Sequence, residues 1–196
     1  MEMKDFFKFG SKLILANFQA VPVGLKEDEN GNSDHLNLIK GNYDHIDFPV
    51  TFKQEDGKKL NDILDTGYAG FYLISEKMKI IIEENELTGW KIFPIKLYDK
   101  KGNKINGYHG FSITGNSSSI NYKKSEINEK KLTPNGPICK FYKGIFIDKW
   151  DGTDFFTPEG TYQTLISRKA AQVIKKNKLT NICLRNFTDI EILVDN

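Results

Sequence analysis

The densest group of acidic residues, and the first place to look for chemistry, is DKWDGTDFF at residues 148–156. Asp148, Asp151 and Asp154 recur at a spacing of three, and grouped carboxylates can hold a divalent metal ion. This spacing differs from the alternating ligands of a calcium loop, so a metal site would require the loop to curl. A solvated turn capped by aspartates explains the same residues. We therefore predict no metal, no cofactor and no catalytic residue, and keep a metal-dependent enzyme using these aspartates as an alternative.

Aromatic side chains flank the same aspartates. Trp150, Phe155 and Phe156 stand beside Asp151 and Asp154 in the sequence. Aromatic residues are common in cores, and they also anchor the centres of protein interfaces. A core role and a contact surface therefore both remain open. The candidate partner-binding set consists of Trp150, Asp151, Asp154, Phe155 and Phe156.

Other residue types that serve catalysis are scattered along the chain. His35, His45 and His109 have no metal-ligand spacing and no neighbouring serine or cysteine of a nucleophile motif. Cys139 and Cys183 are not spaced as a metal pair, and two thiols fit a reducing compartment better than a disulfide framework. Since no enzyme motif is recognisable, we predict that the protein is not an enzyme.

An internal repeat organises the elements that must position this stretch. Residues 73–88 read LISEKMKIIIEENELT, and residues 165–180 read LISRKAAQVIKKNKLT, at an offset of 165 − 73 = 92 residues. Eight of the sixteen positions match, where chance would give roughly one. Each copy predicts the end of a strand, a short helix, a cap and a new strand.

Residue types within each copy indicate where its helix begins and ends. Ser75 and Ser167 are good N-cap residues, since a serine hydroxyl can accept from a free N–H of the first helical turn. Apolar residues then recur on one helical face in both copies. Asn85 and Asn177 suit a left-handed position at the helix C-terminus.

The two predicted helices differ in charge and at one apolar position. Residues 75–86 carry 2 − 4 = −2 charges, whereas residues 167–178 carry +5. The charge difference has two explanations. The solvated faces of the two helices diverged after a duplication, or the second helix forms a cationic patch for an acidic partner. Ile80 points away from the apolar face, and we expect the N-terminal quarter to cover it. The equivalent residue of the second copy, Gln172, should stay exposed.

Strand signals around the copies indicate the fold class. Phe93, Ile95 and Leu97 alternate with other residues, which predicts a strand with one buried face, and Pro94 argues for an edge position or a bulge. We predict an α+β fold with two related helix-plus-strand halves packed on an antiparallel or mixed sheet. Residues 1–196 form a single domain, with a first half of about 1–116, a connector of about 117–137 and a second half of about 138–196.

Composition limits the partners. Hydrophobic residues make up 39% of the chain, which is enough for a real core, but no run approaches the roughly 20 apolar residues that span a membrane. The net charge is only +2, and two of the 28 basic residues are arginines, the usual tools for bidentate phosphate and base contacts. We expect a cytoplasmic protein without membrane or nucleic-acid contacts. A lysine-rich module that binds anions or nucleic acid remains the alternative.

Three segments together are similar to a known bacterial family. LISEKMKIIIEENELTGWKIFPIKLYDKKG, WDGTDFF and LISRKAAQVIKKNKLTNICL resemble the immunity proteins of polymorphic toxin systems called immunity protein eleven. The resemblance covers about Lys58 to Asp195. In that family a serine-led helix ends in a leucine-threonine-glycine phrase, whereas the second copy here has Asn181 in place of the glycine. The resemblance implies a non-enzymatic protein that binds and neutralises a cognate toxin domain.

Overall fold

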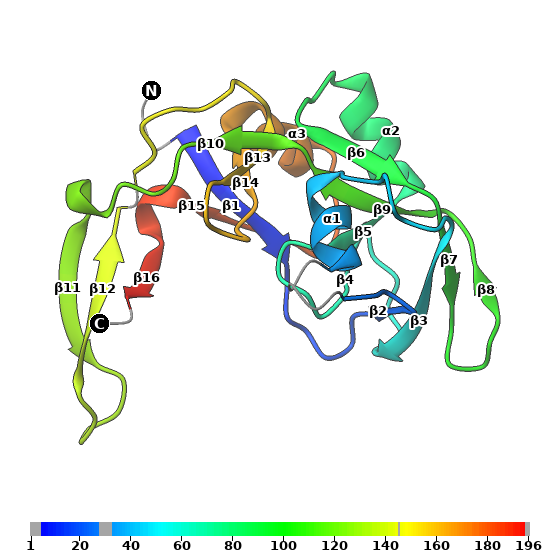
Figure 1. The fold of residues 1–196 in the computed structure, drawn as a ribbon, viewed down its shortest axis with the longest axis horizontal. Coiled ribbons are helices and arrows are strands. Elements are labelled where there is room, and N and C mark those ends of the chain that lie inside the picture. Colours follow the sequence, from blue (N-terminus) through cyan, green and yellow to red (C-terminus); the bar gives the residue numbers. More distant parts are fainter. Residues whose placement is uncertain (1–4, 28–32, 145, 195–196) are drawn as a thin grey trace.

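The computed structural model describes residues 5–27, 33–144 and 146–194. In these residues, three short α-helices combine with three β-sheets, two of which contain parallel as well as antiparallel pairs. The two larger sheets make up the body, and the smallest stands apart from it (Figure 1). The expected mixture of helices with mixed sheets is confirmed.

The largest sheet has eight strands in the order β6-β9-β5-β4-β2-β3-β7-β8. They are β2 (Gln19–Val23), β3 (Val50–Asp56), β4 (Ile63–Asp65), β5 (Tyr72–Ser75), β6 (Trp90–Phe93), β7 (Ile95–Tyr98), β8 (Lys104–Ile105) and β9 (Tyr108–Ile113). β6 and β7 are separated only by Pro94 but lie near opposite ends of this order, so the sheet curls into a half-barrel. Pro94 divides the expected strand in two because proline cannot donate to a ladder.

The second sheet has five strands in the order β10-β13-β14-β1-β15. They are β1 (Phe6–Ser11), β10 (Gly115–Ser117), β13 (Phe155–Pro158), β14 (Leu165–Ser167) and β15 (Ile182–Asn186). The N-terminal strand β1 pairs antiparallel with both β14 and β15. The first strand of the chain therefore completes the sheet around the second copy of the repeat.

The two repeat copies form the predicted helices, α2 (Glu76–Glu84) and α3 (Arg168–Lys176). The Ser75 hydroxyl accepts from Met78 N at 3.1 Å, and the Ser167 hydroxyl accepts from Ala170 N at 3.2 Å. Both serine N-caps are therefore confirmed. Each helix follows one strand and precedes another, as the repeat predicted.

Two expectations about these helices are wrong. Asn85 and Asn177 have φ of −95° and −87°, and the left-handed positions fall one residue later, on Glu86 and Lys178. The asparagine amides instead donate back to helix carbonyls four residues earlier, which keeps each asparagine in the final turn. Ile80 is 42% exposed, so no segment in the described part of the chain covers it as expected. Gln172 is exposed, as expected.

The hydrophobic core is shared between the two large sheets. Met78 and Ile82 of α2 pack in one cluster with Ala170 and Ile174 of α3 and with strands of both sheets. Alternation along β13 sends Phe155 into this cluster and the next residue to the opposite face of its sheet. A further cluster involves the curled sheet and α1 (Asp34–Lys40).

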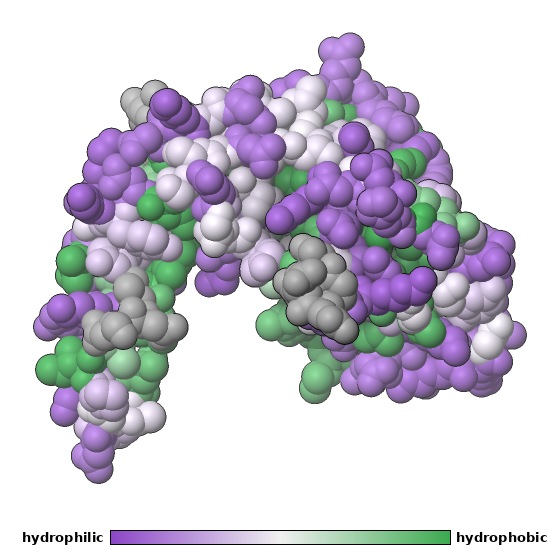
Figure 2. Space-filling model, viewed as in Figure 1, coloured by the Kyte–Doolittle hydropathy of each residue, from purple (hydrophilic) through white to green (hydrophobic). Residues whose placement is uncertain are grey.

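The third sheet forms an arm beside the body. Its strands are β11 (Glu126–Lys131), β12 (Ile138–Lys143) and β16 (Glu191–Val194), with the 3₁₀ helices Tyr122–Lys124 and Phe187–Asp189 preceding β11 and β16. β11 lies inside the segment expected to be a connector. Figure 2 shows an arch, with an open hollow between the arm and the lower part of the body.

One local pattern occurs in both large sheets. The strands β2-β4-β5-β9-β6 are neighbours in one sheet, as β10-β13-β14-β1-β15 are in the other. Ile63 of β4 pairs with Ile74 of β5, and Phe155 of β13 pairs with Ile166 of β14. The offsets are 155 − 63 = 92 and 166 − 74 = 92, equal to that of the sequence repeat. β9 runs antiparallel to both of its neighbours, as does β1.

Candidate functional site

The acidic stretch that drew attention in the sequence does not form a shared carboxylate centre. Asp148 accepts hydrogen bonds from Asn121 and Lys124, which hold its pKa below the usual value, the lysine contributing most. Asp151 accepts from the backbone N–H of Asn116 at 2.6 Å and from Thr153. Burial would raise the pKa of Asp151, but these hydrogen bonds outweigh it and lower the pKa.

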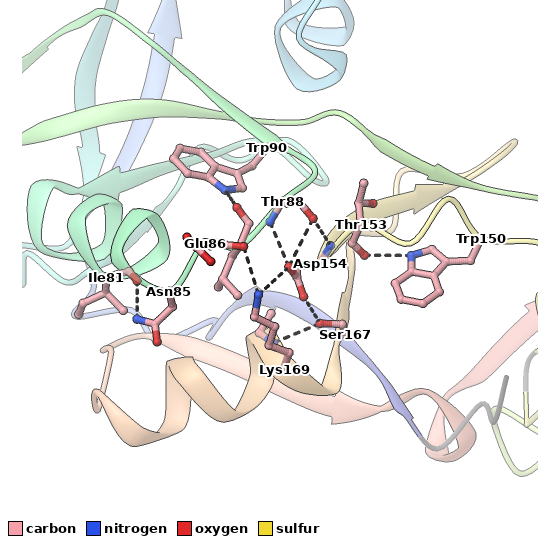
Figure 3. Close-up of polar contacts among 12 residues, drawn as sticks. Ile81, Asn85, Glu86, Thr88, Trp90, Trp150, Thr153, Asp154, Ser167 and Lys169 are labelled. Carbon is pink, nitrogen blue, oxygen red and sulfur yellow. Dashed lines mark hydrogen bonds and ion pairs between the residues drawn. The ribbon is translucent and has the colours of Figure 1, made fainter.

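Asp154, the third member of this group, lies at the centre of the polar site in Figure 3. One oxygen accepts from the backbone N–H of Thr88 at 3.1 Å and from its hydroxyl at 3.4 Å. The other oxygen accepts from the N-cap hydroxyl of Ser167 at 2.6 Å. Lys169 stands 3.8 Å away and donates to the carbonyl of Glu86. Asp154 therefore ties the start of α3 to the segment that follows α2.

Asp62 makes the same contacts at the other end of the repeat. It accepts from the backbone N–H of Thr180 at 2.8 Å, from its hydroxyl at 2.9 Å and from the N-cap hydroxyl of Ser75 at 2.9 Å. Lys77 stands 3.4 Å away. Burial would raise the pKa of Asp62, but hydrogen bonds from Thr180 and Ser75 and the lysine charge outweigh it, so the pKa is lowered. Each aspartate holds the N-cap serine of one helix and the threonine that follows the other helix.

These two polar sites are structural supports. Asp62 and Asp154 are 7% exposed, and each carboxylate is surrounded by protein donors. Within the described ranges, no group of three or more His, Cys, Asp or Glu side chains is arranged to hold a metal ion. These hydrogen bonds fix the two helices relative to each other, because a charge-assisted hydrogen bond has a defined geometry.

The five residues proposed from sequence for partner contact divide into two groups. Phe155 and Phe156 have no exposed surface, and Asp154 is buried in its hydrogen bonds. Trp150 is half-buried against Phe156, with ring centroids 5.7 Å apart, and its indole N–H donates to a backbone carbonyl at 2.9 Å. Asp151 is exposed. Only Trp150 and Asp151 therefore keep surface that a partner can touch.

Asp62 and the pairing of the two threonines were missed in the sequence. Thr88 and Thr180 are matching positions of the repeat, but their partners lie outside the sixteen-residue match. The repeat offset could have identified Asp62. Asp62 and Asp154 are 154 − 62 = 92 residues apart, so an aspartate precedes each copy at the same distance. An acid at that spacing from a serine N-cap indicates a helix-start support once the repeat is known.

The positions that follow the two threonines differ in a way that the structure explains. Gly89 has φ of +84°, and a Cβ there would lie 2.0 Å from the carbonyl oxygen of Phe155. Asn181 has φ of +63°, and asparagine is the residue that best replaces glycine in this region. Its side chain bonds to Asn17 at 2.6 Å and to the carbonyl of Ile63 at 2.9 Å. Asparagine, where the first copy has glycine, therefore also supports the neighbouring segments through its side chain.

Comparison with protein families places the chain. The model of the immunity protein family (Imm11) matches residues 17–189, most of the chain, so the chain belongs to this family. The resemblance seen in the sequence is confirmed and extends towards the N-terminus beyond Lys58. The comparison with curated proteins finds no match. No helix in the described residues is both long and apolar enough to cross a membrane.

Proposed function

We propose that this chain binds the toxin domain of its own polymorphic toxin system and blocks it, in the bacterial cytoplasm, without catalysing a reaction. The observation that carries this proposal is the match to the immunity protein family over residues 17–189. Blocking by binding requires a preformed surface, in which a few anchors hold the complex and complementary charge speeds the encounter.

The chemistry of the polar sites supports binding over catalysis. The three aspartates of the candidate metal loop accept from separate donors, and Asp154 and Asp62 hold the helices. A metal-dependent enzyme acting through this loop therefore has no converging carboxylates to support it. Of the residues proposed from sequence, we retain Trp150 and Asp151 as candidates for the rim of the toxin contact, because both keep exposed surface.

We also propose that the body is one domain built from two halves that share an ancestor. The aspartate, the N-cap serine, the lysine and the threonine recur at a constant offset, and they make the same contacts. Strand order and register recur with them. Independent origin would not be expected to produce equal spacing at this many positions.

The function is tested by expressing the reading frame directly upstream of this gene, which we expect to encode the toxin, with and without the chain. We expect toxicity to be relieved by the chain and the C-terminal domain of that protein to co-purify with it at a 1:1 ratio. Toxicity that persists, with no complex formed, would contradict the proposal. Steeply salt-dependent binding of the chain to nucleic acid would instead favour the lysine-rich module.

A further inference from the structure

We propose that the loop between β1 and β2, residues 12–18, is the anchor with which this chain holds its toxin domain. This inference rests on the proposed function and assigns its contact site. The partner chemistry is a folded protein domain with an apolar recess bordered by acidic residues. We call residues 12–18 the anchor loop.

The anchor loop exposes three consecutive apolar side chains and buries a fourth, Phe18. Leu13 is 93% exposed, Leu15 is 90% exposed, and Ile14 between them is 53% exposed. Single exposed apolar residues are common on protein surfaces, but three consecutive ones form a patch of the kind that marks an interaction site. Covering these apolar side chains with a partner removes them from water, which favours binding.

The stem of the loop is nevertheless firmly held. Asn181 accepts from Lys12 N at 3.0 Å through its carbonyl, and its side chain bonds to Asn17 at 2.6 Å. The backbone N–H groups of Lys58 and Lys59 both donate to the carbonyl of Ala16, at 3.0 and 2.9 Å. A loop that is already ordered loses less entropy when it binds, so these leucines are presented in advance.

The fold itself does not require a loop of this length. β9 leads into β10 through Thr114 alone, whereas the equivalent step from β1 to β2 takes residues 12–18. Both connections begin in the same way: Thr114 N donates to the carbonyl of Gly89 at 2.9 Å, and Lys12 N donates to that of Asn181. Residues 16–18 of the longer connection pair with residues 58–59 and bury Phe18, but residues 13–15 lead into solvent. These three residues therefore serve something other than the sheet.

Charge around the loop specifies the partner. Lys12, Lys58 and Lys59 are exposed, and no carboxylate in the described part of the chain lies within ion-pair distance of them. Of the nearby acids that the structure describes, Asp56 pairs with Lys100 at 3.9 Å, whereas Asp65 accepts only from neutral donors and keeps its negative charge. Among these described residues, three unpaired lysines against one unpaired carboxylate leave an excess of positive charge beside the leucines, which suits an acidic rim.

The position of the loop favours a folded domain over a short peptide. In Figure 1 the loop runs along the lower edge of the body, on the side of the hollow, between the blue strands β1 and β2. Figure 2 shows hydrophobic side chains at this edge and also on the arm across the hollow. Strand register places Ile127 and Ile138 of the arm, 53% and 58% exposed, on one face of its sheet and Leu193, 42% exposed, on the other. A convex domain seated in the hollow would meet the anchor loop and one face of the arm.

The test compares three proteins: the wild-type chain, the double variant Leu13→Ser/Leu15→Ser, and a matched control, Ile80→Gln. Ile80 is also an exposed apolar residue, but it lies on α2. The dissociation constant of each for the C-terminal domain encoded upstream is measured by titration calorimetry, with thermal unfolding measured alongside. We expect the double variant to bind about 100-fold more weakly with an unchanged melting temperature, as for two lost anchors, and the control to bind within about twofold of wild type.

The outcomes separate the two claims. A double variant that binds as tightly as wild type overturns the anchor loop and leaves the proposed function intact. A wild-type chain that binds no toxin domain overturns both. Two other occupants are checked on the same proteins. Sedimentation of wild type, but not of the double variant, with phosphatidylglycerol vesicles would show a membrane contact. A wild-type dimer that the double variant converts to monomer would show a second copy of the chain. Either result overturns the proposal.

Discussion

Asp154 and Asp62 occupy equivalent places 92 residues apart, and each accepts from a threonine backbone N–H, the same threonine hydroxyl and a serine N-cap. Their surroundings differ. The Asp154 site is closed by Gly89, which packs against the carbonyl of Phe155. The Asp62 site continues through Asn181 to the stem of the exposed anchor loop. The same polar frame therefore supports close packing at Asp154 and the presentation of an exposed loop at Asp62.

The largest expected effect comes from removing either carboxylate. Asp154→Ala removes the charged acceptor shared by Thr88 and the buried Ser167, and Asp62→Ala removes the one shared by Thr180 and the half-buried Ser75. We expect each variant to lose about 3–5 kcal/mol of unfolding free energy. Chemical denaturation of both variants measures this. A loss below about 1 kcal/mol for only one of them would break the equivalence of the two sites.

The next prediction concerns the residue that distinguishes the two sites. Gly89→Ala places a Cβ 2.0 Å from a backbone oxygen at φ of +84°, so we expect it to cost about 2–4 kcal/mol. Asn181→Gly keeps the favoured backbone geometry and loses only side-chain hydrogen bonds, so about 1–2 kcal/mol is expected. Thermal unfolding measures the stability of the two variants. An Asn181→Gly variant that is less stable than the Gly89→Ala variant would contradict the expected order.

The pH dependence of stability sharpens the description of Asp62. Its pKa is lowered in the folded state, so protonation is harder there than in the unfolded chain, where the carboxyl titrates near about 3.9. The stabilisation is therefore present above that value and is lost as pH falls through the folded-state pKa. We expect Asp62→Asn to be destabilised at neutral pH and to lose less additional stability than wild type on acidification below about pH 4. Denaturation at several pH values checks this, and parallel wild-type and variant profiles would contradict it.

The smallest effects are expected at the helix starts. Ser75→Ala and Ser167→Ala each remove one N-cap acceptor and one hydroxyl that donates to an aspartate. We expect losses of about 1–2 kcal/mol for each, equal to one another within about 0.5 kcal/mol. Replacement by threonine provides the control, since it keeps the hydroxyl and should retain most of the stability. Unequal losses would show that the two caps are not equivalent.

Local features of the fold could be predicted from the sequence. The helices and both N-caps follow from serine and from apolar spacing within a few residues. The place of β1 between β14 and β15 could not be predicted, because strand pairing joins residues far apart in the chain. The cover expected over Ile80 was inferred from one side chain, and an isolated exposed isoleucine is common on protein surfaces.

The candidate site was less predictable than the fold. The sequence drew attention to three aspartates at close spacing, but the partners of Asp154 are set by contacts with the other copy, 66 residues away. Asp62 and Thr180 are 118 residues apart. The exposed leucines carried no signal, because an apolar run of that length is also typical of a buried strand.

Amide hydrogen exchange of the chain, alone and in complex with the upstream C-terminal domain, shows whether the anchor loop contacts the toxin. Toxin neutralisation through the anchor loop predicts slower exchange across residues 12–18 in the complex, with exchange on α2 around Ile80 unchanged. Protection confined to other surfaces would contradict the anchor loop. Identical exchange with and without that domain at saturating concentration would contradict toxin binding itself.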